Sequence, residues 1–395
     1  MALVDLWKTN KAELDTKHLQ QIIAIAGDGK LADTSTASSE FRALLRVIPS
    51  DKLGEYARQC LESSFDGSGL ALQDIVNEIG RRLAFAVEAG RYRGKKGEPG
   101  HDGLWTLKNG RKIIVEVKTT DAYSISLDTV AEYRKALAKK DVVSLEQSSI
   151  LLVVGRKDTG GLEAQIRGSR YAWDMRIISV DALLRLMSLK ESLDDPTTAS
   201  QISDILVPQE FTRVDSVIDL VFATAEEVAA ADGTDHDESK ATPGPMTGKK
   251  FTPVSFHAKC AQRIEQFLDT SLIKETRTAY RAPETDLRVL IAVSKTHGKG
   301  KVPAYWFAFH PHQKTLLEES PQAKVAFGCG SEETVFLVPL KLLSDHLHET
   351  WTTEREGKTY WHIHIQRRQG KHYWALRKGA ENIPIDEYLL PPSDK

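Results

Sequence analysis

One stretch, residues 101–120, most constrains what this chain of 395 residues can fold into. Its segment 113–117 is rich in β-branched residues, which is typical of a strand. Asp102 precedes Glu116 by thirteen intervening residues, and Lys118 follows two residues later. Because residues i and i+2 of a strand point to the same face, Glu116 and Lys118 share a face. Ile113, Val115 and Val117 then face the opposite way, into a core.

The segment before this strand predicts a β-hairpin. Residues 108–110 form a three-residue loop whose glycine takes the position that needs positive φ, with Leu107 and Arg111 on either side. This register places Asp102 opposite Glu116. A two-residue turn would shift the register by one residue and move Asp102 to the other face, so the prediction depends on the longer loop.

Two carboxylates and an ammonium on one face suit metal-dependent phosphodiester hydrolysis. Asp102 and Glu116 can hold Mg²⁺, which prefers oxygen ligands and keeps several waters. The metal lowers the pKa of a bound water and stabilises charge on the phosphate, and Lys118 can orient or deprotonate that water. The alternative is an amphipathic edge hairpin with solvated charges, since this spacing by itself is a loose pattern.

Asp102, Glu116 and Lys118 resemble the motif of the PD-(D/E)XK nuclease superfamily. His101 stands where the family name has proline, and the order of elements after the hairpin is similar to the Mrr-like branch. The resemblance covers roughly residues 68–190. It implies a restriction-endonuclease-like α/β core with a mixed sheet, Mg²⁺ as cofactor with Mn²⁺ as a substitute, and the backbone carbonyl of Val117 as a further metal ligand.

A helix is expected before the hairpin, because the apolar residues of segment 72–83 recur with a period near 3.6. Glu78 lies off this apolar stripe. In the family an acid on this helix often completes the metal site, and Glu78 is at the matching position. The alternative is a surface glutamate beside Arg81 and Arg82.

Basic residues near the hairpin are candidates for DNA contacts. The glycine-rich loop 87–100 suits a clamp on the phosphate backbone, although a solvated loop is the alternative. Hydroxyls after the catalytic strand could also bind phosphate. The candidates are Arg91, Arg93, Lys95, Lys96 and Thr119.

The continuation predicts strand–helix alternation and hence crossover packing on a mixed sheet. Segments 149–155 and 175–180 are apolar runs expected to be strands buried on both faces. The helix between them carries Gln165, which could support the site. Arg167 and Arg170 on the same helix could reach phosphates or form ordinary ion pairs.

The domain organisation follows from shifts in composition. Residues 1–65 are predicted to form a helical extension, which could contact DNA, mediate dimerisation or be only a packing extension. Residues 66–222 are predicted to form the nuclease domain. Residues 223–250 are rich in alanine, glycine, proline and acids and predict a flexible linker. Residues 251–395 then form a second domain.

The second domain is expected to be α+β with a largely antiparallel sheet, and it resembles no family that we recognise. Strand-like runs lie at 287–293, 304–309, 324–327, 334–338, 359–365 and 372–376. Aromatic and basic residues interleave near its end, and Lys299 and Lys301 lie in a loop. We expect a DNA-recognition role, with tryptophans in the core as the alternative.

Nine of the twelve histidines lie in this second domain, including three His-x-His pairs. His362 and His364 would share one face of a strand. A zinc site is the weaker interpretation, because no thiol pair or clear third ligand lies nearby. Polar surface histidines or DNA contacts are the stronger one.

Bulk properties are those of a globular protein. The net charge is −2, so nucleic-acid binding must come from local patches. Three scattered cysteines, no signal peptide and no apolar run of about 18 residues predict a cytoplasmic protein.

The sequence therefore predicts a Mg²⁺-dependent DNA endonuclease, of the restriction or anti-phage kind, with target recognition in the C-terminal half. We expect a homodimer, because many such enzymes dimerise to cut both strands, and no nucleotide cofactor, because no ATPase motif is evident. The alternatives are a repair, structure-specific or RNA nuclease, and a non-catalytic nucleic-acid-binding protein with a relic nuclease fold.

Overall fold

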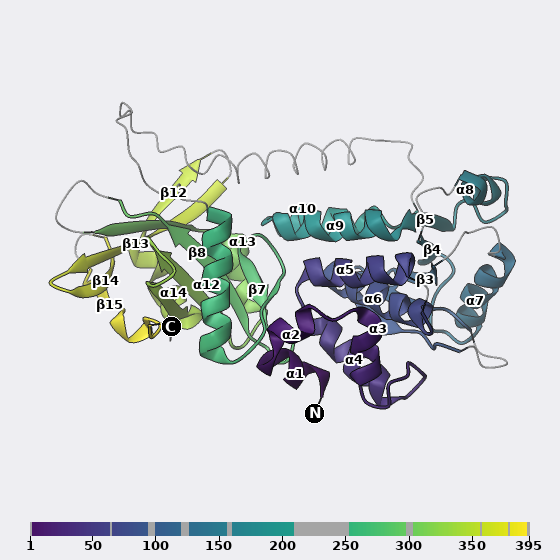
Figure 1. Cartoon of the computed structure of the whole chain (residues 1–395). Coiled ribbons are helices and arrows are strands. Elements are labelled where there is room, and N and C mark those ends of the chain that lie inside the picture. Colours follow the sequence, from purple (N-terminus) through teal and green to yellow (C-terminus); the bar gives the residue numbers. More distant parts are fainter. Residues whose placement is uncertain are drawn as a thin grey trace, which may run out of the picture. The chain divides into compact units, whose positions relative to one another are not determined.

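The computed structural model describes two compact units, residues 1–229 and 230–395 (Figure 1). The described residues are 2–63, 65–93, 99–119, 126–155, 160–208, 253–297, 303–355, 358–377 and 380–392. The expected linker 223–250 lies outside these ranges, as do Lys95, Lys96, Lys299 and Lys301. In the described ranges, no helix has the length and apolar character that a membrane crossing requires.

Unit 1 contains a five-stranded mixed sheet in the order β1-β2-β3-β4-β5. The β1–β2 and β2–β3 pairs are antiparallel, whereas β3, β4 and β5 run parallel to one another. Their bounds are β1 Ala86–Ala89, β2 Gly103–Thr106, β3 Lys112–Lys118, β4 Ser148–Val154 and β5 Met175–Ser179. The expected mixed α/β class is thus confirmed at this coarse level.

The β2–β3 hairpin has the predicted register. Leu107 N–H donates to Arg111 O at 2.9 Å across the three-residue loop, and Gly103 lies opposite Val115. Gly110 has φ +84°, the left-handed region that glycine adopts without a steric penalty. Continuing this register by one residue brings Asp102, which lies just before β2, beside Glu116.

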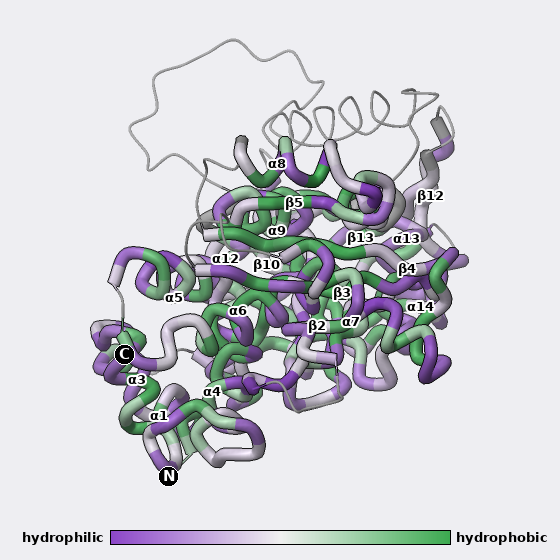
Figure 2. The backbone as a smooth tube through the Cα atoms, turned by 90° about the vertical axis from the view of Figure 1, so that its right-hand side faces the viewer, coloured by the Kyte–Doolittle hydropathy of each residue, from purple (hydrophilic) through white to green (hydrophobic). Residues whose placement is uncertain are grey.

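The two faces of this sheet are covered by different helices. Odd-numbered residues of β3, such as Ile113 and Val115, pack into a core with helices α4, α5, α6 and α9, whereas Leu104 and Ile114 pack with α7 and α8. Figure 2 shows hydrophobic residues concentrated in α6 and the central strands. The bounds are α4 Thr36–Val47, α5 Ser50–Glu62, α6 Ser68–Arg82, α7 Leu127–Lys139, α8 Gly160–Arg167 and α9 Val180–Ser192.

The N-terminal helices share the first of these cores. Trp7, Leu19 and Ile22 belong to the same buried cluster as β3 and α6. Helix α4 ends at Val47, and Pro49 is the residue directly before α5. The remaining helices in the described part of unit 1 are α1 Leu3–Thr9, α2 Lys11–Asp15, α3 Leu19–Ile25 and α10 Pro196–Asp204.

Unit 2 has two sheets, in the orders β11-β10-β8-β7-β6 and β12-β13-β14-β15, with β9 also paired to β13. The predicted strands are present, and all described pairings are antiparallel except β8 with β10. The strands are β6 Ile273–Lys274, β7 Ala279–Arg281, β8 Arg288–Ser294, β9 Ala304–Phe309, β10 Lys324–Cys329, β11 Val335–Pro339, β12 Trp351–Arg355, β13 Lys358–Arg368, β14 Lys371–Ala375 and β15 Ile383–Pro384. The helices are α12 Pro253–Leu268, α13 Pro311–Glu318 and α14 Leu340–His346, with short 3-10 turns at Leu347–Glu349 and Asp386–Tyr388.

Replacing Gly80 by alanine should destabilise unit 1, because the added Cβ would lie 2.6 Å from the buried Trp105 ring that packs on α6. We expect the free energy of unfolding to fall by about 1–3 kcal/mol, measured by urea denaturation. Gly54→Ala is the matched control on α5, since its Cβ would make only ordinary contacts at 3.7 Å. Equal stability of the two variants would contradict the close packing of α6 on the hairpin.

Candidate active site

Asp102, Glu116 and Lys118 come together at the carboxyl end of β3. All three lie at even-numbered positions, on the face that α7 covers. Lys118 Nζ is 2.8 Å from Glu116 Oε1. The Val117 N–H donates to Asp102 Oδ2 at 2.7 Å, which fixes the orientation of that carboxyl group.

Glu116 is buried and only partly satisfied. The residue is 6% exposed, and Oε2 has no hydrogen-bond partner among the residues that the structure describes. Burial raises the pKa of Glu116, against the opposing effect of the Lys118 ammonium. A buried carboxylate oxygen without a donor is costly, so a cation or a donor bound to this atom would offset that cost.

The surroundings of Asp102 disfavour the ionised form of its carboxyl group. Burial, and next the charge of Glu116, raise the pKa of Asp102 to about 7, although the Val117 N–H and Lys118 favour the charged form. Two neighbouring carboxyl groups in a partly dehydrated site resist simultaneous ionisation. A cation bound between them would remove that conflict.

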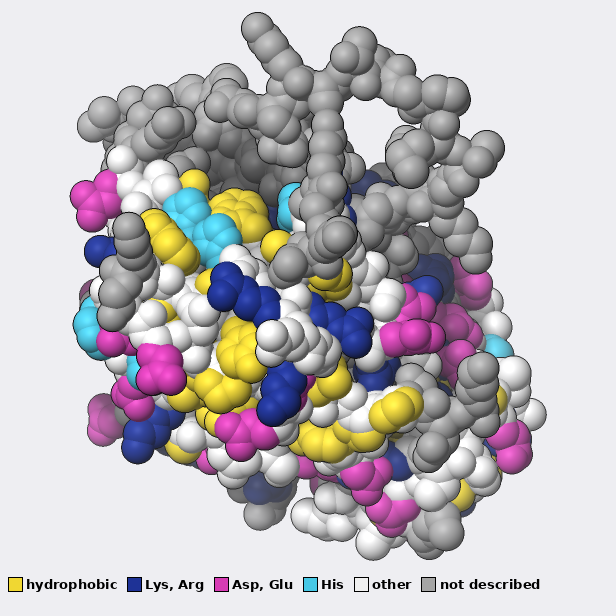
Figure 3. All heavy atoms as spheres, turned by 90° about the vertical axis from the view of Figure 1, so that its left-hand side faces the viewer, with side chains coloured by type: hydrophobic (Ala, Val, Ile, Leu, Met, Phe, Trp, Pro, Cys, Tyr) yellow, Lys and Arg dark blue, Asp and Glu magenta, His cyan; other side chains and the backbone are white. Residues whose placement is uncertain are grey.

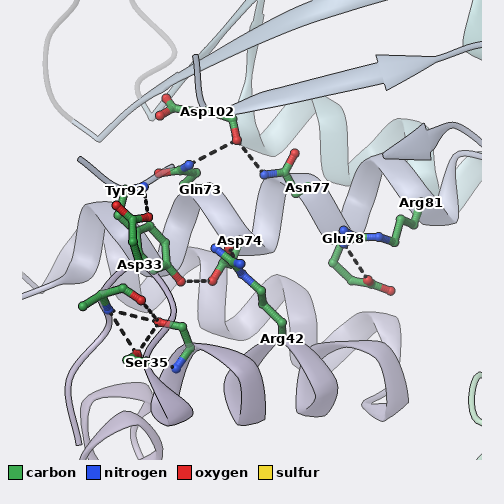
Figure 4. A network of polar contacts seen from close by, with 12 residues as sticks. Asp33, Ser35, Arg42, Gln73, Asp74, Asn77, Glu78, Arg81, Tyr92 and Asp102 are labelled. Atoms are coloured by element: carbon green, nitrogen blue, oxygen red, sulfur yellow. Dashed lines mark hydrogen bonds and ion pairs between the residues drawn. The ribbon is translucent and has the colours of Figure 1, made fainter. Parts of the chain in front are cut away.

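The backbone of Asp102 is held by three donors. Gln73 Nε2 and Asn77 Nδ2, both on α6, donate to Asp102 O at 3.1 and 2.9 Å (Figure 4). The Gly90 N–H donates to the same oxygen at 2.9 Å. The buried Trp105 indole N–H in turn donates to Asn77 Oδ1 at 2.9 Å, so the amide has one orientation and Asp102 is fixed to the helix.

Two glycines allow this close approach. A Cβ on Gly90 would lie 1.9 Å from His101 O, and one on Gly103 would lie 2.2 Å from Asn77 Oδ1. Sequence reasoning missed these glycines and the two amides. The signal that could have revealed the amides is their spacing of four residues on a helix that is otherwise largely apolar.

Glu78 does not join the carboxyl pair. It is buried, and its two oxygens lie 3.3 Å from Arg82 Nε and 3.4 Å from Arg81 Nη1. Figure 4 shows its side chain directed away from Asp102. The buried Arg82 also donates to Leu45 O and Ile48 O, so Glu78 compensates a buried cation, contrary to the expectation that it completes the metal site.

Val117 occupies a position that fits the expected carbonyl ligand. The N–H and C=O of one strand residue point to the same side of the strand. Because the Val117 N–H reaches Asp102, while Lys118 O accepts from Gly155 N on the opposite side, the Val117 carbonyl faces the Asp102 side of β3.

The donor set suits Mg²⁺. Within the described ranges, no group of three or more His, Cys, Asp or Glu side chains gathers to hold a metal. Two carboxyl groups and one carbonyl are nevertheless enough, since Mg²⁺ is usually bound through one or two carboxylates and keeps several waters. The unpartnered Glu116 Oε2 is the observation that favours a cation here.

Tyr133 and His101 border the site and were not singled out as functional. A Cβ on Gly100 would lie 3.2 Å from the Tyr133 hydroxyl, and burial, then the charge of Glu116, raise the pKa of Tyr133. His101 stands at the proline position of the family motif. Burial lowers the pKa of His101, and its Nδ1 has no partner in the described part of the chain.

The predicted DNA-contact residues occupy varied positions. Arg91 and Arg93 are exposed, and Thr119 is half-buried directly after β3. On α8, Gln165 and Arg167 are exposed. Arg170 pairs with Asp128 at 2.9 Å, with both side chains 72% exposed, which is the ordinary ion pair that the sequence left open.

Comparison of the chain with protein-family models and with curated proteins gives no match. The resemblance to PD-(D/E)XK nucleases therefore stays a prediction from the residues.

Glu78→Gln should destabilise the protein without weakening metal binding. Loss of the charge that compensates the buried Arg82 should lower the free energy of unfolding by roughly 3 kcal/mol. The exposed Glu62→Gln is the control for stability. Calorimetric titration with Mg²⁺ should give the wild-type affinity, and a marked loss of affinity would restore Glu78 as a metal ligand.

Asp102→Asn should stabilise the metal-free protein at pH 8. Because the pKa of Asp102 is raised to about 7, above its unfolded value, the folded state binds the extra proton, and its stability falls as pH rises through the window between these two values. The amide removes the charge and still offers an oxygen to Val117. We expect a gain of about 1–3 kcal/mol at pH 8 and a smaller gain at pH 5.

Urea denaturation in chelator at the two pH values measures this effect, with the exposed Asp66→Asn as control. Destabilisation by Asp102→Asn at pH 8 would contradict the unfavourable charge at this position.

Proposed function

We propose that the chain is a Mg²⁺-dependent nuclease that hydrolyses phosphodiester bonds in DNA, with a restriction-endonuclease-like core in unit 1. The observation that carries the proposal is the carboxyl pair of the half-buried Asp102 and the buried Glu116, with Lys118 on the same face. Two neighbouring carboxyl groups of this kind destabilise the metal-free protein. Their presence is explained if they bind a metal for phosphoryl chemistry.

Asp102 and Glu116 are the side chains that would hold the metal, together with the Val117 carbonyl. When bound, Mg²⁺ supplies a water of lowered pKa and neutralises charge on the scissile phosphate. The fixed backbone of Asp102 supports this role. Because α6 already holds Asp102 in place, this residue needs no reorganisation when the metal binds. Proton binding to Asp102 competes with the metal, so affinity should fall below about pH 7.

Lys118 is suited to act as a charged donor. Burial by itself lowers its pKa, but the bond to Glu116 and the neighbouring carboxyl groups raise it above the ordinary value. The ammonium therefore keeps its proton at neutral pH. In this state it can orient a water or stabilise negative charge that develops on the phosphate, rather than remove a proton.

The topology of unit 1 supports the proposal. An antiparallel hairpin that continues into parallel strands, with helices on both faces, is the order expected for this nuclease core. The exposed Arg91, Arg93 and Arg167 supply positive charge for a phosphate backbone. A restriction or anti-phage role, a homodimer and a cytoplasmic location belong to the same proposal and rest on the resemblance.

Cleavage of plasmid and phage DNA, methylated and unmethylated, with Mg²⁺ or Mn²⁺ tests this function. Asp102→Ala, Glu116→Ala and Lys118→Ala should each reduce the rate by about 10³-fold or more, because each removes a metal ligand or a charge that stabilises the transition state. Lys108→Ala is the control, since Lys108 is exposed in the loop of the same hairpin.

Variants that remain folded and bind DNA but do not cut would support the site. Cleavage by all three variants at the wild-type rate would place the chemistry elsewhere. DNA binding without cleavage by the wild type in either metal would favour the non-catalytic alternative.

A further inference from the structure

The outward face of strand β13 in unit 2 is lined by rings. Ile363 and Ile365 of this strand are buried in the core. Alternate residues of a strand point to opposite faces, so Tyr360, His362 and His364 lie on the other face. Solvent-facing positions of a sheet are usually polar, which makes a row of rings there unusual.

Neighbouring strands add tryptophans to this row. Trp306 of β9 lies opposite His364, and Trp351 of β12 lies opposite His362. Trp306 is 39% exposed and Trp351 is 40% exposed. We call the surface formed by Trp306, Trp351, Tyr360, His362 and His364 the ring face.

Each ring of the ring face contacts at least one other ring of this surface. The Tyr360 and His362 centroids are 5.1 Å apart, and those of His362 and His364 are 6.0 Å apart with nearly parallel planes. Trp351 meets His364 edge-on at 5.0 Å, and Trp306 lies 5.6 Å from His362. These contacts fix the orientation of the rings before any ligand binds.

His362 is held neutral and in one orientation. The Trp306 indole N–H donates to Nδ1 at 2.9 Å, so Nδ1 has no proton, and Nε2 must donate to Thr353 Oγ1 at 2.6 Å. Burial lowers the pKa of both His362 and His364. The histidines therefore contribute flat, uncharged rings at neutral pH.

The sheet surface next to one end of the ring face is positively charged. Beyond His364, the same side of the sheet carries Gln366 and Arg368 of β13, with Lys371 opposite Arg368 on β14. The strand positions on this side whose side chains the structure describes are Ala304, Trp306, Ala308, Trp351, Thr353, Tyr360, His362, His364, Gln366, Arg368, Lys371, Tyr373, Ala375 and Pro384. None of these is acidic, and the nearby Asp386 pairs with His372, whose position alternates to the other side.

Figure 3 views unit 2 from the side on which β12–β14 lie in Figure 1. It shows histidines gathered among hydrophobic side chains, with lysine and arginine side chains nearby. A polyanion with flat apolar groups complements such a surface in both shape and charge.

We propose that the ring face binds unstacked bases of single-stranded nucleic acid, with Arg368 and Lys371 contacting phosphates. Aromatic side chains bind single strands by stacking, which every base permits because every base has a π-face. In an intact duplex the bases stack on one another, so their faces are hidden from a sheet surface. A sugar ligand is less well matched, because its many hydroxyls need carboxylate or amide partners and the described positions offer only Gln366.

The proposed binding surface lies in unit 2, so binding does not depend on hydrolysis in unit 1. Its test is therefore binding by the full-length chain in chelator, where metal-dependent cleavage cannot occur. The probes are a fluorescent oligothymidylate of about 20 nucleotides and a duplex of the same length, followed by anisotropy.

The single strand should bind more tightly than the duplex. Trp306→Ala and Trp351→Ala should each weaken single-strand binding by about 5- to 100-fold, as expected when one stacking partner is lost. Trp306→Phe should retain much of the affinity, because it keeps a ring. Trp173→Ala is the matched control, since Trp173 is 72% exposed and lies in unit 1.

Arg368→Ala and Lys371→Ala should each lower the dependence of log affinity on log salt concentration by about 0.7. Circular dichroism would confirm that every variant is folded. Wild-type binding by both tryptophan-to-alanine variants would overturn the inference, as would equal loss in Trp306→Phe and Trp306→Ala or tighter binding of the duplex.

Discussion

The candidate active site depends on the attachment of helix α6 to the β2–β3 hairpin. Gln73 and Asn77 donate to one carbonyl oxygen, that of Asp102, and the Trp105 indole fixes the Asn77 amide. These donors are buried, so each would be costly if it had no acceptor. The hairpin thus has one position on the helix, and the Asp102 carboxyl group follows from it.

The glycines at this junction serve the same attachment. Gly80, Gly90 and Gly103 each lie where a Cβ would overlap a neighbouring group. The helix, the strand before the site and the hairpin can therefore approach more closely than ordinary side chains allow. This close approach also shields the carboxyl pair from water, and burial is the main cause of the raised pKa of Asp102.

Stability and function oppose each other at this pair. Two carboxyl groups that share a partly dehydrated face with one ammonium make the metal-free protein less stable at high pH. The same arrangement favours a divalent cation, because the cation replaces the proton that Asp102 would otherwise retain. The salt bridge between Glu78 and Arg82 has a different role. It compensates the charge of a buried arginine, whose guanidinium also donates to Leu45 O and Ile48 O.

Unit 2 shows a comparable division between two faces of one sheet. One face of β13 packs Ile363 and Ile365 into the core, and the other bears rings that are held by ring contacts and by hydrogen bonds to His362. The alternation of the sequence is enough to expect two faces. The uncharged state of His362 requires Trp306 and Thr353, which come from two other strands.

The sequence by itself determined the local geometry of the site. Strand formers at 113–117 and the three-residue loop at 108–110 specify the hairpin and its register, because strand alternation and turn length are local properties. Most strands of unit 2 followed from the same kind of signal. Tertiary structure alone decided which distant groups meet, such as Asn77 with Asp102, Glu78 with Arg82 and Trp306 with His362. A helical position predicts a face but not the partner on that face, and a partner is chosen by packing between segments that are far apart in the chain.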